Sequence, residues 1–244
     1  MESVNRIWRR PPRRLTLRRD DVHVWRADLD VTDDDLQSLS HGLAPDERER
    51  ARRFRFPRDR RHFIAARGVL REILSRYLGV PAGDVRFQYG SHGKPALEDA
   101  LGRSDLNFSL SHSLELALCA VTLGRAVGID LEWMRKDLAS KQVAERFFSP
   151  HEVSTLCTLP ESMQIEGFFN CWTRKEAYVK ALGEGLSFPL DRFEVSLTPG
   201  EPARLISTAD GKEWSMQTLS PGAGFVAALV VEGRGRQLRC WRWP

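Results

Sequence analysis

Three short segments of the chain combine acidic, basic or hydroxyl side chains in patterns that occur in catalytic and binding sites. The first is Gly128-Ile129-Asp130-Leu131-Glu132. Residues two apart on a strand share a face, so Asp130 and Glu132 would project together while Ile129 and Leu131 enter a core. Two adjacent carboxylates repel each other and need a cation or protons, and oxygen ligands suit Mg²⁺. The alternative is a pair of acids on a solvated face.

The second segment, residues 172–180, combines charge with an apolar setting. On a helix, Glu176 and Lys180 are four residues apart and therefore neighbours on one face. The common form of such a pair is a surface ion pair. Phe168 and Phe169 make this stretch strongly apolar, so the alternative is a partly desolvated pair that is costly without a further partner.

The third segment pairs Gly93-Lys94-Pro95 with residues 107–113, Asn-Phe-Ser-Leu-Ser-His-Ser. The Lys94 ammonium, the Ser111 hydroxyl and the His112 imidazole could gather around a phosphate, although an ordinary polar loop and strand end would have the same composition. A Ser–His hydrolase is disfavoured because adjacent strand residues point to opposite faces and the sequence has no Gly-x-Ser-x-Gly elbow. A Walker loop and a Gly-x-Gly-x-x-Gly fingerprint are also absent from the sequence.

These segments depend on helices and strands that the apolar periodicity predicts. Helices are expected over Pro45–Phe54, from Pro57 to Gly79, after the capping residue Ser149, and over Glu161–Leu182. Strands are expected at Val22–Leu29, Phe108–His112, Leu116–Thr122, Val127–Met134, Phe193–Leu197, Ala203–Ser207, Trp214–Leu219, Phe225–Val231 and Leu238–Trp241.

The two halves of the sequence resemble one another. Leu116–Arg125 aligns with Phe225–Arg234 at an offset of 109 residues, and the two long helices end in Tyr77-Leu78-Gly79 and Ala181-Leu182-Gly183. Several such matches in the same order predict a duplicated α+β unit with a ligand site in the cleft between the copies. We divide the chain into residues 1–20, a basic flexible arm; residues 21–125, an N-terminal subdomain; and residues 126–244, a C-terminal subdomain.

Composition restricts the class of protein. The chain has 244 residues, of which 41% are hydrophobic and 29% charged, as in ordinary globular domains. Its longest clean apolar run, Phe225–Val231, is far shorter than the roughly 20 residues of a membrane-spanning helix. No apolar stretch follows the N-terminal arginines, so a secretory signal is not expected. The four cysteines lack paired spacing, which favours a reducing, cytoplasmic location.

Positive charge is concentrated in two places. Residues 1–20 hold seven arginines and sum to +5, so the rest of the chain sums to −1 within a total of +4. A second cluster, Arg48–Arg61, has eight arginines in fourteen residues. The arm is either a solvated tail or a binder of nucleic acid or other polyanions, and no zinc finger, helix-turn-helix or RNA-binding signature follows it.

In their order and spacing, the three segments resemble the signature of 4′-phosphopantetheinyl transferases. The length and duplication resemble the surfactin-synthetase-activating (Sfp-like) monomeric branch of that family. The similarity runs from about Pro45 to Leu190. It implies two α+β subdomains in a pseudo-twofold arrangement with the active site between them. It also implies transfer of the phosphopantetheine arm of coenzyme A to a serine of a carrier protein, with release of 3′,5′-ADP.

The resemblance implies a role for each residue of the acidic and helical segments. Asp130, Glu132 and Glu176 would gather Mg²⁺ with the coenzyme A pyrophosphate. Phosphoryl transfer needs mostly positioning and charge neutralisation from the protein, which agrees with this set. Glu176 is also the candidate base for the serine hydroxyl, directly or through a water, and Lys180 would meet charge on the leaving phosphate.

A separate pocket would hold the 3′-phosphate and adenine of coenzyme A. By resemblance, the residues that contribute to it are Lys94, Ser111 and His112, with Arg50 where the family has a cation and Arg67 as a further candidate. The arginines of Arg48–Arg61 would form a phosphate-attracting rim or a solvated helix face. Glu47 stands where some members of the family have a lysine, so this contact departs from the family pattern.

The expected partner is an acyl or peptidyl carrier protein, an acidic helical domain. Its candidate docking surface is formed by Arg135, Lys136, Lys141 and Arg146 with apolar residues of Leu138–Phe148, unless those residues only pack on the second half. Two other classes remain open: a non-catalytic polyanion binder that uses the arm, and a different Mg²⁺-dependent nucleotide enzyme. A binder needs no carboxylate cluster, so the acidic residues favour a monomeric transferase that binds neither membrane nor nucleic acid.

Overall fold

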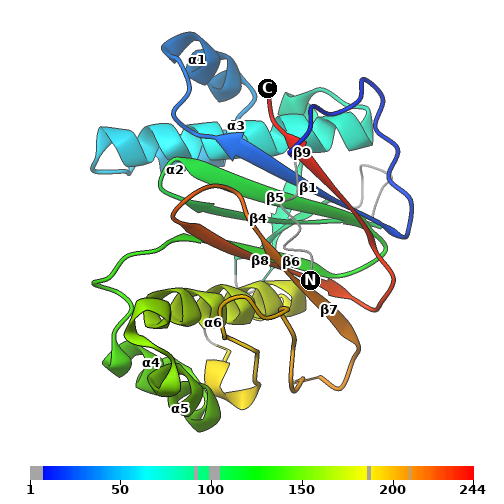
Figure 1. The fold of residues 1–244 in the computed structure, drawn as a ribbon. Helices are drawn as coiled ribbons and strands as arrows, with labels where there is room; N and C mark the ends of the chain where they lie inside the picture. Colours follow the sequence, from blue (N-terminus) through cyan, green and yellow to red (C-terminus); the bar gives the residue numbers. More distant parts are fainter. Residues whose placement is uncertain (1–7, 91–92, 99–104, 186–187, 209) are drawn as a thin grey trace.

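The computed structural model describes residues 8–244 except 91–92, 99–104, 186–187 and 209. Its main elements form four layers: helix α3, a first sheet, a second sheet and helix α6 (Figure 1). Helix α3 spans Pro57–Leu78 and helix α6 spans Glu161–Leu182. Each begins at a proline-marked turn and ends at a glycine in the left-handed conformation, Gly79 or Gly183, as the sequence predicts.

The two sheets repeat one strand order. The first sheet has the order β4-β5-β1-β9 and the second has the order β6-β8-β7. In the first sheet, β5 pairs antiparallel with β4, the strand before it, and with β1, the first strand of its half. In the second sheet, β8 pairs antiparallel with β7, the strand before it, and with β6, the first strand of its half. The strands are β1 (Asp21–Asp28), β4 (Leu106–Ser113), β5 (Leu116–Leu123), β6 (Val127–Trp133), β7 (Trp214–Leu219), β8 (Phe225–Glu232) and β9 (Gln237–Arg242). The expected α+β fold built from two similar units is confirmed.

Shorter elements connect the layers. Besides α3 and α6, the structure describes the shorter helices α1 (Asp33–His41), α2 (Pro45–Arg52), α4 (Lys141–Phe147) and α5 (Pro150–Thr158), with 3₁₀ turns at Ala82–Asp84 and Leu190–Arg192. Strands β2 (Phe87–Tyr89) and β3 (Pro95–Leu97) form a separate hairpin. The predicted capping box of Ser149 and Glu152 is present at the start of α5.

Strand alternation divides the interior into three cores. On β5, Ala117, Cys119 and Val121 face α3, whereas Leu116, Leu118 and Ala120 face the second sheet. On β6, Ile129 and Leu131 fill the core between the sheets. The other face of β6 carries Gly128, Asp130 and Glu132 toward α6 and the edge of the sheet. The predicted shared face of the two carboxylates is confirmed.

Two sequence predictions are wrong in detail. The strands expected at Phe193–Leu197 and Ala203–Ser207 are reduced to one isolated bridge, Val195 with Leu205. The hydroxyls of Ser196 and Ser207 accept the N–H groups of Arg204 and Glu194, so side chains replace part of the strand ladder. The last strand, β9, was assigned to the second half, yet it pairs parallel with β1 in the first sheet.

The described part of the basic arm contacts the rest of the chain. Residues 1–7 lie outside the described residues. From Trp8 onward the arm follows the surface: the Trp8 Nε1 donates to the Ser220 carbonyl at 3.0 Å, and Arg9 exchanges backbone hydrogen bonds with Cys240 and Arg242. Leu15 and Leu17 pack against the α3 core. Residues 8–20 therefore contact the folded part of the chain at several points, and the flexibility of the arm stays a prediction.

Candidate active site

The close approach of helix α6 to strand β6 depends on Gly128. A Cβ at this position would lie 1.9 Å from the Ala177 carbonyl oxygen and 2.5 Å from the Ala181 nitrogen. Any other residue would push the helix away from the strand. With glycine, the helix backbone rests on the strand and brings Glu176 and Lys180 to the level of Asp130.

Asp130 is the centre of the polar contacts on this face. It is 4% exposed, and its Oδ1 accepts hydrogen bonds from the Lys180 Nζ at 2.7 Å and the Ser111 Oγ at 2.9 Å. The Lys180 Nζ also donates to the Ser111 Oγ at 3.1 Å. Within the described residues, the buried Asp130 Oδ2 has no hydrogen-bond partner. Lys180 therefore pairs across elements with Asp130, and the Glu176–Lys180 pair expected along the helix is not an ion pair.

Glu176 is a buried carboxylate with an open acceptor. It is 6% exposed, and its Oε1 has no hydrogen-bond partner among the described residues. Its pKa is raised to about 7, first by burial and then by the charge of Asp130, with a smaller contribution from Glu132, while Lys180 opposes the shift. A surface ion pair is thereby excluded for this segment. A carboxyl group with a pKa near neutrality can take up or hold a proton.

Glu132 completes the acidic group at the sheet edge. The Ser113 Oγ donates to its Oε2 at 3.0 Å. Burial and then Asp130 raise its pKa, while the Ser113 hydrogen bond, Lys180 and Arg135 lower it. Among the described residues, no group of three or more His, Cys, Asp or Glu side chains is placed so that it could hold a metal ion.

Lys94 ties the last turn of α6 to the start of β6. Its Nζ donates to the Lys180 carbonyl at 2.5 Å and to the Val127 carbonyl at 3.4 Å. A cation at the carbonyl end of a helix is favourable. Burial, and then the charge of Lys180, lower the Lys94 pKa to about 8. The lysine held by Gly93 and Pro95 thus fixes the helix that carries Lys180.

His112 faces a second group of cations on the opposite side of β4. Removal from water is the first cause that lowers its pKa, followed by the charges of Lys180, His62 and Arg50. The Arg50 guanidinium lies over the Phe63 ring at 5.3 Å, and the His62 Nε2 contacts Asp30 at 2.7 Å. His62 was not singled out from the sequence, because a lone histidine on a helix carries no local signal.

Comparison with known proteins identifies this arrangement. Residues 126–230 match the 4′-phosphopantetheinyl transferase superfamily, and residues 27–123 match the 4′-phosphopantetheinyl transferase N-terminal family. The chain is 48% identical over 240 residues to the 4′-phosphopantetheinyl transferase HetI of Nostoc sp. strain PCC 7120, covering 98% of this chain and 100% of that protein. The chain belongs to the 4′-phosphopantetheinyl transferase superfamily. It is therefore a transferase enzyme.

Two further similarities involve smaller parts of the transferase. It is 32% identical to the 4′-phosphopantetheinyl transferase Sfp of Bacillus subtilis, over 70% of this chain and 73% of that protein. A crystal structure of Thermotoga maritima holo-[acyl-carrier-protein] synthase matches 44% of this chain and 62% of that chain, with 26% identity and a TM-score of 0.35. No helix among the described residues is long and apolar enough to cross a membrane.

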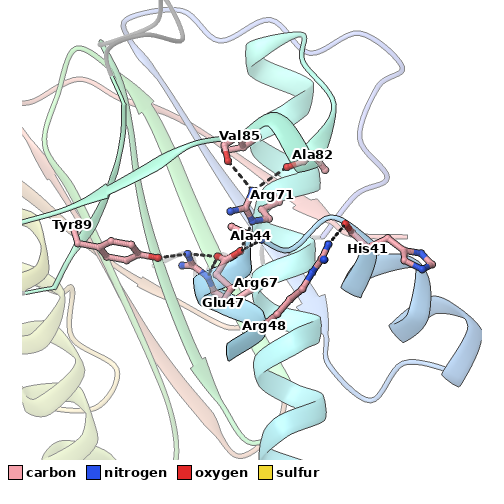
Figure 2. A network of polar contacts seen from close by, with 9 residues as sticks. All are labelled: His41, Ala44, Glu47, Arg48, Arg67, Arg71, Ala82, Val85 and Tyr89. Carbon is pink, nitrogen blue, oxygen red and sulfur yellow. Dashed lines mark hydrogen bonds and ion pairs between the residues drawn. The ribbon is translucent and has the colours of Figure 1, made fainter. Parts of the chain in front are cut away.

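Arg67 lies on α3 in a different polar network of the transferase, where it contacts Glu47 of α2 (Figure 2). It is 9% exposed, its Nε donates to the Glu47 Oε1 at 2.5 Å, and its Nη2 donates to the Tyr89 hydroxyl at 3.0 Å. The Arg71 Nε donates to the Glu47 Oε2 at 2.6 Å, and Glu47 also accepts from the Ala44 N–H at 2.9 Å. The departure at Glu47 is thus structural: the carboxylate caps α2 and holds two buried arginines, so Arg67 is already engaged by the protein.

The structure therefore sorts the predicted site residues into three groups. Contacts or electrostatic coupling connect Asp130, Glu132, Glu176, Lys180, Lys94 and Ser111. His112 lies beside them and is coupled electrostatically to Arg50, and Arg67 lies apart. Ser113 and Gly128 were quoted within the motifs but given no role. Their signals were the alternation of serine along the strand and a glycine inside an apolar strand.

Proposed function

We propose that the transferase moves the 4′-phosphopantetheine group of coenzyme A to a serine of an acyl or peptidyl carrier protein, releases 3′,5′-ADP and requires Mg²⁺. The observation that carries the proposal is the pair of buried carboxylate oxygens without partners, Asp130 Oδ2 and Glu176 Oε1, beside the Lys180 ammonium. Buried acceptors are costly unless a ligand satisfies them. The proposal extends to a monomeric, cytoplasmic enzyme, as the sequence resemblance implies.

The donor set fits Mg²⁺. Carboxylate oxygens are the ligands that this hard cation prefers, and it commonly takes one or two from the protein with phosphate oxygens from the substrate. Asp130, Glu132 and Glu176 would hold it together with those phosphate oxygens. Burial and then the charge of Asp130 raise the pKa values of Glu132 and Glu176, so a bound cation would stabilise their charged forms. Bound there, the ion would neutralise charge on the pyrophosphate of coenzyme A.

The side chains of the protein supply proton transfer and charge compensation. Glu176 would accept the proton of the carrier serine at its free Oε1, because its pKa of about 7 suits a base at neutral pH. The serine oxygen forms the new bond to the phosphorus that bears the pantetheine arm, and the bond from that phosphorus to the 3′,5′-ADP oxygen breaks. Lys180 lies 2.7 Å from Asp130 and would compensate charge on the departing phosphate.

His112 and Arg50 are the proposed contacts for the 3′-phosphate of coenzyme A. After removal from water, the charges of Lys180, His62 and Arg50 lower the pKa of His112, so an anion bound there would reduce the electrostatic repulsion. Lys94 and Ser111 would contribute indirectly, because Lys94 holds the end of α6 and Ser111 holds the Asp130 carboxylate. Arg67 is the weakest of the candidate coenzyme A contacts, because Glu47 already pairs with its guanidinium.

The proposed carrier surface begins beside Glu132. Arg135 is exposed and close enough to lower the pKa of Glu132. Lys136, Lys141 and Arg146 are also exposed, and Leu138 is 38% exposed. The inner face of α4 packs its Val143 and Ala144 on the second core, so both sequence interpretations apply to different faces of one segment. A basic surface next to the acidic cluster suits an acidic helical partner.

Mass spectrometry tests the proposal directly. A panel of apo-carrier proteins is incubated with coenzyme A, with and without Mg²⁺, and the expected result is a mass gain of one phosphopantetheine on at least one carrier. Asp130→Ala should nearly abolish this gain, whereas Asp20→Ala, which alters an exposed acid in the first half, should leave it unchanged. If no carrier gains mass under any condition, the proposed substrate is wrong.

A further inference from the structure

Strands β4 and β6 are joined by serine hydroxyls. The two strands belong to different sheets, where β4 is an edge strand of the first and β6 an edge strand of the second. The serines at alternate positions of β4 face β6, and each hydroxyl accepts one backbone N–H of β6. The bonds run from Ile129 to Ser109 at 3.1 Å, from Leu131 to Ser111 at 3.2 Å and from Trp133 to Ser113 at 3.0 Å.

Two of these three hydroxyls also donate a hydrogen bond to a carboxylate. The Ser111 Oγ donates to the Asp130 Oδ1 at 2.9 Å, and the Ser113 Oγ donates to the Glu132 Oε2 at 3.0 Å. In both cases the carboxylate belongs to the residue just before the N–H that the serine accepts. The residue in this position opposite Ser109 is Gly128, which has no side chain.

The Ser111 hydroxyl has no capacity left for another ligand. A hydroxyl has one proton to donate and two lone pairs to accept with. Ser111 donates to Asp130, and it accepts from the Leu131 N–H and from the Lys180 Nζ at 3.1 Å. It is also 7% exposed. A coenzyme phosphate could bind this hydroxyl only by displacing one of these three partners.

We propose that Ser111 and Ser113 are positioning residues for the acidic cluster. Each fixes β6 against β4 through a backbone N–H and holds one oxygen of a carboxylate, and for Asp130 this leaves the Oδ2 open toward a cation. Ser109 performs only the first task. The inference rests on the proposed function, because it assigns Asp130 and Glu132 to the metal.

Three alanine variants separate the two tasks. Each of S109A, S111A and S113A removes one β4 hydroxyl that accepts a backbone N–H of β6, so each should lower the thermal unfolding midpoint by about 2–4 °C. S111A and S113A should in addition raise the Mg²⁺ concentration for half-maximal rate by about 10-fold, the size expected when a hydrogen bond to a metal ligand is lost. S109A, the matched control, should leave this value unchanged.

Two further measurements have readouts that loss of stability does not move. Mn²⁺ binding in the absence of substrate, followed by electron paramagnetic resonance, should weaken about 10-fold for S113A and be unchanged for S109A. Ser113→Thr keeps the hydroxyl and should restore binding. The KM for coenzyme A at saturating Mg²⁺ should be unchanged in S113A.

The outcomes distinguish this inference from the proposed function. If wild-type enzyme transfers phosphopantetheine equally fast with EDTA, the metal assignment fails and the inference fails with it. If wild type depends on Mg²⁺ but S109A weakens Mn²⁺ binding as much as S113A does, only the inference is overturned. It is likewise overturned if S111A raises the KM for coenzyme A and not that for the analogue lacking the 3′-phosphate, because Ser111 is then a phosphate ligand.

Discussion

Helices α3 and α6 are equivalent elements of the two halves, yet they face different strand residues. Both have 22 residues, and Arg76 and Lys180 each lie three residues before the capping glycine. Strand registers extend the equivalence: Trp25 on β1 pairs with Cys119 on β5, and Asp130 on β6 pairs with Ala228 on β8. Because Cys119 and Ala228 are both fourth in their strands, Trp25 and Asp130 occupy equivalent places.

Both long helices carry a cation at the equivalent position, Arg76 or Lys180, but the partner of this cation differs between the two halves. The Arg76 guanidinium lies 5.2 Å from the centre of the Trp25 ring, whereas the Lys180 ammonium lies 2.7 Å from the Asp130 carboxylate. The next position on the same face is Ala27 in the first half and Glu132 in the second. Carboxylates at two positions of one architecture thus distinguish a chemical site from an apolar core.

Each half also contains a closed buried ion pair, that is, a pair in which the protein supplies a partner to both oxygens of the carboxylate. These pairs are examples of charges with a structural role. Glu47 pairs with Arg71 at 2.6 Å, and Glu152 pairs with Lys175 at 2.8 Å. Each glutamate caps its helix, and each has partners on both carboxylate oxygens. Asp130 and Glu176 instead keep an open oxygen. A buried charge with all partners supplied by the protein is structural, and one with an open acceptor is available to a ligand.

The largest expected difference between the halves is catalytic. Glu176→Gln removes the basic site, so transfer should slow by roughly 10²–10⁴-fold while coenzyme A still binds. Glu72→Gln changes the equivalent residue of α3 and should leave turnover unchanged. Single-turnover rates and coenzyme A calorimetry measure both effects. A wild-type-like acidic limb in the pH–rate profile of Glu176→Gln would mean that the proton goes to another group.

The closed ion pairs predict the next largest effect, on stability alone. Lys175→Met leaves Glu152 buried without its cation and should lower the free energy of unfolding by about 3–5 kcal/mol. Lys141→Met breaks the exposed pair with Glu145 and should cost no more than about 0.5 kcal/mol. Urea denaturation measures both. Equal effects of the two variants would contradict the distinction between closed buried pairs and surface pairs.

Gly128 tests the contact that brings α6 to the site. Gly128→Ala places a Cβ against the Ala177 carbonyl, so we expect a loss of about 3 kcal/mol of stability together with slower transfer. Gly83→Ala is the control, because nothing lies within 4 Å of a Cβ there. Thermal unfolding and turnover measured on the same samples provide the readout. Wild-type stability and turnover in Gly128→Ala would show that the helix can shift without consequence.

The raised pKa of Glu176 predicts the smallest effect, a pH dependence of stability. Its pKa is about 7 in the folded protein and 4.5 when unperturbed, so the folded state holds this proton more tightly. This contribution to the free energy of unfolding therefore falls as pH rises from about 4.5 to about 7 and stays low above that. Without divalent metal, Glu176→Gln should exceed wild type by ~1–3 kcal/mol at pH 8 and approach it at pH 5. A stability difference independent of pH would contradict the shift.

The sequence determined the elements whose limits are set by local chemistry. Proline at the start and glycine at the end fixed both bounds of α3 and α6, and the two-residue spacing placed Asp130 and Glu132 on one face. The strands expected around Val195 and Leu205 did not form, because serine hydroxyls eight and thirteen residues away accept the backbone N–H groups that a ladder needs. Such competition has no local pattern.

The partners of the charged side chains depend on how the layers pack. The sequence predicted Glu176 and Lys180 as neighbours on one helix face, and the resemblance made Arg67 and Ser111 candidates for coenzyme A binding. In the packed structure Lys180 pairs with Asp130, Arg67 pairs with Glu47, and the hydroxyl of Ser111 bonds to strand β6 and to Lys180. The physical reason is that residue type and spacing fix the face on which a side chain lies. Its partner is set by groups from other elements, which enter the same few ångströms only when the layers are packed.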